Sequence, residues 1–221
     1  MSYVYDAIKL LKPELKETPL IGFSGSPFTV ACYLIEKQSS KTFSNVHTLI
    51  NSNPDLLHTI LDGLTAVTIT HLSNQIKAGV NAVQLFDTWG SILSGTLYHD
   101  FSLAYMQKIV TAISAYNIPI IIYSKDTKHK IKSLASLNCN VISVDWDTPI
   151  SSLTTHYPTL SWQGNLNPHT LLKSLPDALK ETKLICDSMK ESNGFIFNLG
   201  HGILPKTPLE HVKAVVDYVK G

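Results

Sequence analysis

Apolar runs of strand length alternate along the chain with stretches whose apolar residues recur at helical spacing. The apolar runs predict six strands, over residues 19–23, 81–87, 118–124, 140–146, 159–166 and 194–200. The amphipathic stretches predict helices over residues 3–17, 27–36, 54–78, 100–116, 126–138, 169–192 and 207–220. The strand runs are nearly continuous, which is typical of a parallel sheet covered by helices. The sequence therefore predicts an α/β fold.

The regular βα period favours a (β/α)8 barrel of the TIM type, in which the loops after the strands build the active site. Such a barrel needs eight strands and typically about 250 residues, whereas this chain has 221 residues and opens with a helix. We expect a TIM-barrel-type fold, shortened to about six βα units, forming a single domain over residues 1–221. The alternative is an open doubly wound sheet with a G-x-G-x-x-G loop after its first strand, which "GFSGSP" does not match.

Composition excludes several classes of function. The formal net charge is +1, which gives no electrostatic footprint for nucleic acid or for an anionic membrane. No apolar run approaches the roughly 18 residues of a membrane span. Cysteine is present at three scattered positions, Cys32, Cys139 and Cys186, without a C-x-x-C pair. This pattern indicates a reducing cytoplasm and argues against a disulfide framework or a thiolate-rich zinc site.

All 18 basic residues are lysine, and the sequence contains no arginine. Arginine is the side chain that best forms paired hydrogen bonds with carboxylates and phosphates. An anionic ligand of this chain must therefore be held by lysine, by backbone N–H groups or by helix N-termini.

Polar residues follow every predicted strand, and in a barrel they would converge on one mouth. They are Ser24, Ser26, Tyr33, Asp87, Thr88, Lys125, Asp126, Asp145, Asp147, Gln163, Asn165, Asn198 and His201. Asp87 and Asp145 are also typical of carboxylates that merely tie loops together, and Tyr33 fits a plain core position equally well. His201 stands out because Gly200 and Gly202 flank it, and glycine permits close approach to the backbone.

Metal and serine-nucleophile motifs are missing from the sequence. There is no H-E-x-x-H, no histidine lies two residues from a cysteine, and no G-x-S-x-G is present. These motifs therefore give no support to zinc chemistry or to a hydrolase of the nucleophile-elbow type.

Six segments occur in an order that resembles the uroporphyrinogen decarboxylase family: "PLIGFSGSPFTVACYLIE", "AVQLFDTWG", "IIIYSKD", "VISVDW", "QGNLNP" and "FNLGHGILPKTPLEHV". The resemblance covers essentially the whole chain. It implies a (β/α)8 barrel, usually a homodimer, that works without metal or organic cofactor. It also implies that the substrate is uroporphyrinogen III, whose four acetate side chains lose carbon dioxide to give coproporphyrinogen III in haem biosynthesis.

The resemblance also implies roles for individual residues. Tyr33, Thr88 and His201 match positions that contact the substrate, and Phe23 matches an aromatic residue of the macrocycle pocket. A pyrrole protonated at carbon becomes an electron sink into which the bond to the carboxylate can break. The enzyme must stabilise that cation, supply protons and anchor an anionic macrocycle. We therefore expect Tyr33, Thr88 and His201 to line one concavity at the carboxyl ends of the strands.

The family's R-Q-A-G-R motif and an aspartate that faces the pyrrole nitrogens precede the segment that this sequence matches. No catalytic residue is therefore assigned within residues 1–221, and we expect the chain by itself to be a poor decarboxylase. One alternative is an inactive fragment, or a partial barrel that binds porphyrinogen or a partner chain. A second is a corrinoid-linked methyltransferase relative, whose zinc site uses a His-x-Cys pair that is absent here.

Overall fold

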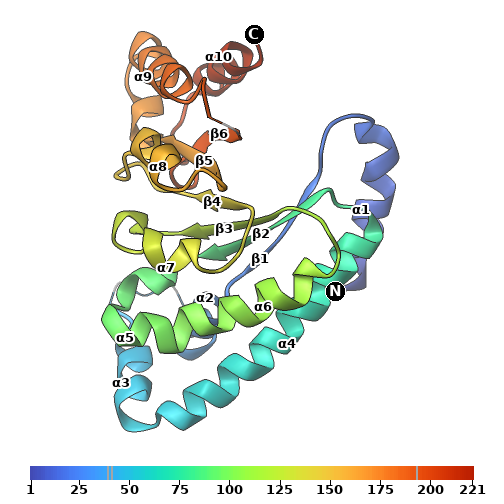
Figure 1. The fold of residues 1–221 in the computed structure, drawn as a ribbon, viewed down its shortest axis with the longest axis vertical. Helices are drawn as coiled ribbons and strands as arrows, with labels where there is room; N and C mark the ends of the chain where they lie inside the picture. The colour runs from blue at the N-terminus through green and yellow to red at the C-terminus, as the bar shows by residue number, and fades with distance from the viewer. Residues whose placement is uncertain (39, 41, 193) are drawn as a thin grey trace. The chain divides into compact units, whose positions relative to one another are not determined.

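The computed structural model describes residues 1–38, 40, 42–192 and 194–221 (Figure 1). Its contacts group into an N-terminal unit, which comprises Met1–Lys125 and Ser136–Cys139, and a C-terminal unit, which comprises Asp126–Ala135 and Asn140–Gly221. Each unit contains three parallel strands. Among the described residues, no helix is both long enough and apolar enough to cross a membrane.

The N-terminal unit is built on strands β1, β2 and β3, with β2 between the other two. Both pairings are parallel: Gly22 lies opposite Val83, which in turn lies opposite Ile120. The elements in chain order are α1 (Ser2–Leu15), β1 (Ile21–Gly25), α2 (Pro27–Glu36), α3 (Ser44–Ser52), α4 (Pro54–Ala78), β2 (Ala82–Asp87), η1 (Trp89–Ile92), α5 (Gly95–Tyr98), η2 (His99–Leu103), α6 (Ala104–Ser114) and β3 (Ile120–Ser124).

Local capping chemistry fixes where the helices of this unit begin and end. The Ser26 hydroxyl accepts a hydrogen bond from the Thr29 amide at 3.1 Å, and Pro27 occupies the first position of α2, where its missing N–H costs nothing. Asn53 caps α4 in the same way. Gly79 ends α4 with φ of 113°, a conformation that glycine adopts without strain.

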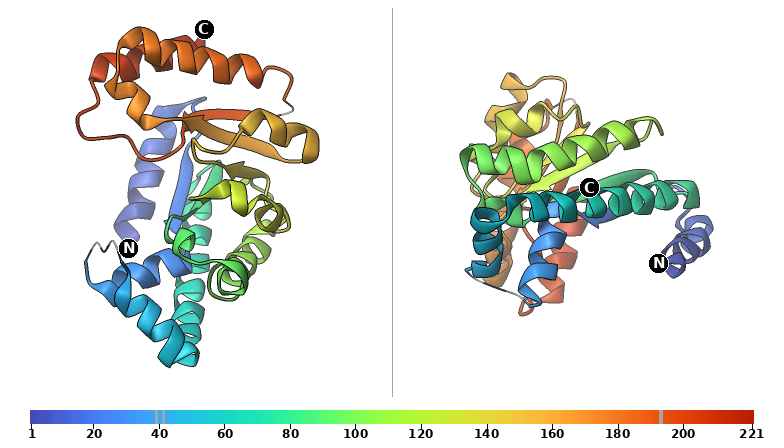
Figure 2. Two further views of the ribbon diagram at one scale, coloured as in Figure 1. Left: turned by 90° about the vertical axis from the view of Figure 1, so that its left-hand side faces the viewer. Right: turned by 90° about the horizontal axis from the view of Figure 1, so that it is seen from below.

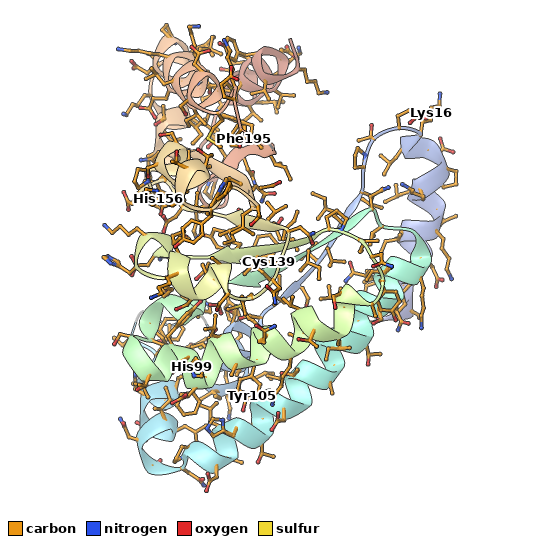
Figure 3. The ribbon with its side chains drawn as sticks, viewed as in Figure 1. Lys16, His99, Tyr105, Cys139, His156 and Phe195 are labelled. Atoms are coloured by element: carbon orange, nitrogen blue, oxygen red, sulfur yellow. The ribbon has the colours of Figure 1, made fainter. Side chains whose placement is uncertain are left out.

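Helices α4 and α6 lie side by side over one face of this sheet (Figures 1 and 2). The Tyr105 hydroxyl on α6 is 2.7 Å from Nδ1 of His58 on α4, so a polar contact joins the two helices (Figure 3). Burial, with a smaller contribution from the Asp62 carboxylate, raises the pKa of Tyr105 to about 12. Tyr105 therefore stays un-ionised over the physiological pH range.

Helix α4 also contains a glycine that no packing requirement explains. A Cβ atom added at Gly63 would meet nothing within 4 Å. We expect Gly63→Ala to raise the free energy of unfolding by about 0.5–1 kcal/mol, because alanine loses less backbone entropy in a helix. Urea denaturation measures this change. A destabilised variant would mean that Gly63 serves a contact outside the described chain.

The C-terminal unit repeats the parallel arrangement with strands β4, β5 and β6, in that order. Helices α9 and α10 lie side by side against this sheet (Figures 1 and 2). Ala178 of α9 and Val215 of α10 form a buried apolar core with Leu166 and Leu171. The elements are η3 (Thr127–His129), α7 (Ile131–Ala135), β4 (Val141–Ser143), α8 (Ile150–His156), β5 (Ser161–Leu166), η4 (Pro168–Leu172), α9 (Leu175–Ser188), β6 (Phe195–Leu199) and α10 (Leu209–Lys220).

The six predicted strands are all present, and within each unit their spatial order follows the sequence. An open doubly wound sheet would interleave strands out of sequence order, and neither unit does so. Several boundaries differ from prediction. The strand predicted over 140–146 pairs only over Val141–Ser143, because the chain then turns into a loop organised by Asp145. The helix predicted over 126–138 is confined to two short turns, η3 and α7.

Three α-helices were not predicted from the sequence, namely α3, α5 and α8. All three are short, and α3 and α8 are rich in serine, threonine and histidine. Such residues compete with the helical backbone for hydrogen bonds and favour turns, so their helical signal is weak.

Candidate active site

A buried aspartate organises the carboxyl end of the N-terminal sheet. Asp87, the last residue of β2, is fully buried. Its Oδ1 accepts hydrogen bonds from the Ser26 hydroxyl at 2.7 Å and the Ser102 hydroxyl at 2.9 Å. The carboxylate thereby ties β2 to the start of α2 and to η2. A Cβ atom at Gly90 would come within 2.0 Å of the other carboxylate oxygen, so the loop after β2 requires a glycine there.

The negative charge of Asp87 also affects its ionisable neighbours. Burial raises the pKa of the Cys32 thiol far above its ordinary value, and the carboxylates of Asp87 and Glu36 add to the effect. Burial and Asp87 likewise raise the pKa of the Tyr98 hydroxyl. Both groups are therefore neutral near pH 7, and Cys32 is unsuited to act as a thiolate nucleophile.

Tyr33 contacts the indole of Trp89, the residue that follows Thr88. The Tyr33 ring projects from α2, is 48% exposed, and meets Trp89 edge-on at a centroid distance of 6.1 Å. Thr88, half-buried, immediately precedes Trp89, whose amide donates to the Thr29 hydroxyl at 3.1 Å. The Lys125 ammonium, at the end of β3, lies 5.8 Å from the centre of the Trp89 ring. Tyr33 is thus a surface tyrosine rather than a core one, and a cation stands near it.

A row of aromatic side chains crosses this sheet on the face opposite α4. A Cβ atom at Gly22 would contact Gln75 of α4, so the next residue along the strand, Phe23, projects from the other face. Phe23 is 62% exposed and meets Phe86 edge-on at 5.9 Å, and Phe86 lies 5.7 Å from Tyr123. The rings of the row stand edge-on or tilted to one another, and Phe23 exposes most of its side chain. The pocket role that the family resemblance implies for Phe23 stays a prediction.

In the C-terminal unit, the two glycines around His201 serve different purposes. A Cβ atom at Gly200 would lie 2.4 Å from the Trp146 amide nitrogen, so the loop can pass Trp146 only with glycine there. The Gly200 amide also donates to the Leu166 carbonyl at 2.8 Å. At Gly202 a Cβ atom would meet nothing within 4 Å. Gly200 therefore fixes the loop against Trp146, whereas Gly202 leaves the exposed His201 imidazole uncrowded.

Asp145 and Asn165 hold the loop that follows β4. The Asp145 carboxylate accepts from the Thr148 hydroxyl at 2.6 Å and from the Thr127 amide at 3.1 Å. The Asn165 amide donates to the Asp145 and Thr148 carbonyls at 2.9 and 2.6 Å. These buried side chains satisfy backbone groups of the loop, which is the loop-tying role considered for Asp145.

Trp146, which contacts His201, and His169, which contacts Trp146, were not identified from the sequence. Trp146 follows Asp145, and its indole meets the His201 ring edge-on at a centroid distance of 6.2 Å. The ring of His169, in η4, meets the same indole edge-on at 6.3 Å. Their position just after β4 and β5 is the signal that could have found them.

The predicted substrate contacts therefore fall into two groups. Tyr33 and Thr88 share the surroundings of Trp89 in the N-terminal unit, and His201 lies beside Trp146 in the C-terminal unit. That all three line one concavity stays a prediction. Within the described part of the chain, no three His, Cys, Asp or Glu side chains gather closely enough to hold a metal ion.

Comparison with known sequences gives a consistent family assignment. The sequence model of the family described as Uroporphyrinogen decarboxylase (URO-D) matches residues 1–221. A uroporphyrinogen decarboxylase of Coxiella burnetii (strain RSA 493 / Nine Mile phase I) is 41% identical over 227 residues, which cover 100% of this chain and 63% of the relative. That of Legionella pneumophila (strain Paris) is 41% identical over 223 residues, or 99% and 63% of the two chains. The chain thus spans a little under two thirds of the length of these relatives.

Comparison with solved structures supports the fold. A methyltransferase from Methanosarcina mazei superposes with a TM-score of 0.82 over 98% of this chain and 63% of that chain, at 21% sequence identity. At this identity the likeness shows the fold alone. The expected α/β fold of the TIM-barrel type, with six strands, is therefore confirmed.

Proposed function

Because the chain belongs to the uroporphyrinogen decarboxylase family, we propose that its protein is a carboxy-lyase that converts uroporphyrinogen III to coproporphyrinogen III. The observation that carries this proposal is the match to the relatives along the whole chain, at 41% identity. The substrate contacts are Tyr33, Thr88 and His201, and the macrocycle packs on the aromatic row that begins at Phe23.

The chemistry divides between stabilising a cation and holding anions. Protonation of a pyrrole ring at carbon creates the electron sink, and the bond to the acetate carboxylate breaks towards it with release of carbon dioxide. A second proton then yields the methyl group, and loss of the first proton from the ring carbon restores the pyrrole, so one proton is consumed for each carbon dioxide released. Electron-rich rings such as those of Tyr33 and Phe23 stabilise a nearby cationic ring. The Nδ1 atom of His201 accepts from the Gly202 amide at 2.7 Å, so in the neutral imidazole the hydrogen is carried by Nε2.

Anion recognition must proceed without arginine in this chain. The Lys125 ammonium lies over the Trp89 ring, which the Tyr33 ring also contacts. We place Lys125 among the groups that attract the substrate carboxylates. Its ammonium group acts as a single point charge, whereas a guanidinium group would form two parallel hydrogen bonds. No residue of the chain is assigned as the catalytic acid or base.

The remaining parts of the proposal follow the family. Residues 1–221 belong to a single barrel domain, the functional enzyme is a homodimer in the cytoplasm, and it works on a small molecule without metal or organic cofactor. Binding to nucleic acid or to a membrane surface forms no part of this function, since the net charge is only +1.

A chimera tests the function. In it, residues 1–221 replace the matched segment of the Coxiella burnetii relative, and coproporphyrinogen formation from uroporphyrinogen is measured anaerobically. We expect turnover, and we expect His201→Ala to lower kcat/KM by about 10-fold, the size of one lost hydrogen bond to a charged group. The control, His156→Ala, removes an exposed histidine whose Nδ1 bonds to Ser152 O of its own helix, and it should leave kcat/KM unchanged.

One of the alternatives has a distinct result in this assay. A folded chimera that binds uroporphyrinogen without releasing carbon dioxide would favour a porphyrinogen-binding partial barrel over an enzyme. The corrinoid-linked methyltransferase alternative draws only on a shared fold with the Methanosarcina mazei protein, because the identity is 21%.

A further inference from the structure

The geometry points to a carboxylate-binding subsite formed by His169 and His201 at the edge of Trp146. Resting on the proposed function, we assign to it one of the side-chain carboxylates of the porphyrinogen. His169 then becomes a positioning residue for the substrate, a role that neither the sequence motifs nor the match to relatives gives it.

Both imidazoles are arranged alike around one indole. The His201 and His169 rings meet Trp146 at 6.2 and 6.3 Å, each with an interplanar angle of 74°. The two histidines are exposed, and Trp146 is half-buried. An indole flanked by two N–H donors offers an apolar surface for a methylene chain and polar groups for the carboxylate at its end. A propionate or acetate side chain has this composition.

The backbone around each histidine is fixed, which gives the pair a preformed geometry. The His169 amide donates to the Asn167 side-chain oxygen at 2.9 Å, and Pro168 at the preceding position restricts the turn. His201 is held by the close passage of Gly200 along the Trp146 backbone and by the bond from the Gly202 amide to its Nδ1. A preformed pair loses little entropy when it binds a ligand.

The hydrogen-bonding capacity of the pair suits an anion. Nε2 of His201 carries a donor hydrogen in the neutral ring and also in the protonated one. Across the residues that the structure describes, the His169 ring nitrogens make no hydrogen bond to protein, so a ligand competes with no internal partner. The chain contains no arginine, whose guanidinium group would form two parallel hydrogen bonds with a carboxylate. The two histidines in contact with Trp146 supply N–H donors in its place.

Calorimetric titration of the 221-residue chain tests the subsite with two probes, uroporphyrin III and benzene-1,2,4,5-tetracarboxylate. We expect His169→Ala to weaken the binding of both probes by about 3–10-fold, as befits an exposed charge-assisted hydrogen bond. His169→Lys should restore affinity to within about threefold, because an ammonium group can hold a carboxylate but cannot replace the edge-on ring contact. His156→Ala is the matched control, since His156 (Figure 3) is the last residue of α8 and its Nδ1 bonds to the Ser152 carbonyl of the same helix.

The two probes separate this inference from the proposed function. If the chain binds uroporphyrin and His169→Ala binds it equally well, the subsite is wrong and the proposed function stands. If only the small tetracarboxylate binds, with the expected loss and rescue, the subsite stands and the porphyrinogen substrate is in doubt. Loss of affinity in both the Ala and Lys variants would mean that His169 acts only by packing on Trp146. Failure of the unmodified chain to bind either probe would overturn the subsite.

Discussion

Replacing Asp87 with alanine should lower the free energy of unfolding by about 2–6 kcal/mol, since two buried hydroxyl donors lose their acceptor at about 1–3 kcal/mol each. Ser26 and Ser102 are the donors, and both are almost completely buried. Removing the Asp87 carboxylate should also loosen the start of α2, the helix that carries Tyr33. Urea denaturation followed by circular dichroism measures the first effect.

The matched control is Asp62→Ala in the same unit. The Asp62 carboxylate is 60% exposed and pairs with Lys108 at 2.6 Å. An exposed ion pair contributes at most about 1 kcal/mol, so this variant should unfold close to the parent. Equal losses in the two aspartate variants would contradict the anchoring role of Asp87. The thiol of Cys32 gives a second readout, because removing the Asp87 charge should lower its pKa and speed its alkylation at alkaline pH.

The second large effect is expected at Gly200. Gly200→Ala would place a methyl group 2.4 Å from the Trp146 amide nitrogen. Two backbone segments must separate to accommodate it, and overpacking of this kind costs about 1–3 kcal/mol. The displaced loop also carries His201 away from Trp146, so porphyrin affinity should fall together with stability.

Gly202→Ala tests the same loop without the clash. Nothing lies within 4 Å of a Cβ atom there, and we expect stability within about 0.5 kcal/mol of the parent, as for an ordinary surface substitution. A thermal unfolding series on the two variants compares them directly. If Gly202→Ala lowered the stability as much as Gly200→Ala, the backbone conformation of the loop, rather than its passage along Trp146, would require the two glycines.

Local sequence signals were enough for the strands and for several helix ends. The apolar runs around β1 to β6 needed no tertiary information, because strands of a parallel sheet are apolar at nearly every position. Ser26–Pro27 and Gly79 marked helix termini correctly, since capping depends on residues only a few positions apart. The family motifs around Tyr33, Thr88 and His201 were likewise readable from the sequence.

Contacts between distant parts of the chain determine the roles of the polar residues at the ends of those strands. Asp87 could have been a site residue or an anchor, and its bonds to Ser26, 61 positions away, and to Ser102 made it an anchor. The sequence singled out the Gly200–His201–Gly202 loop, but only the approach of Trp146 explains Gly200. Strand positions follow from a periodicity that each segment carries within itself, whereas hydrogen-bond partners and close backbone contacts exist only after the chain has folded.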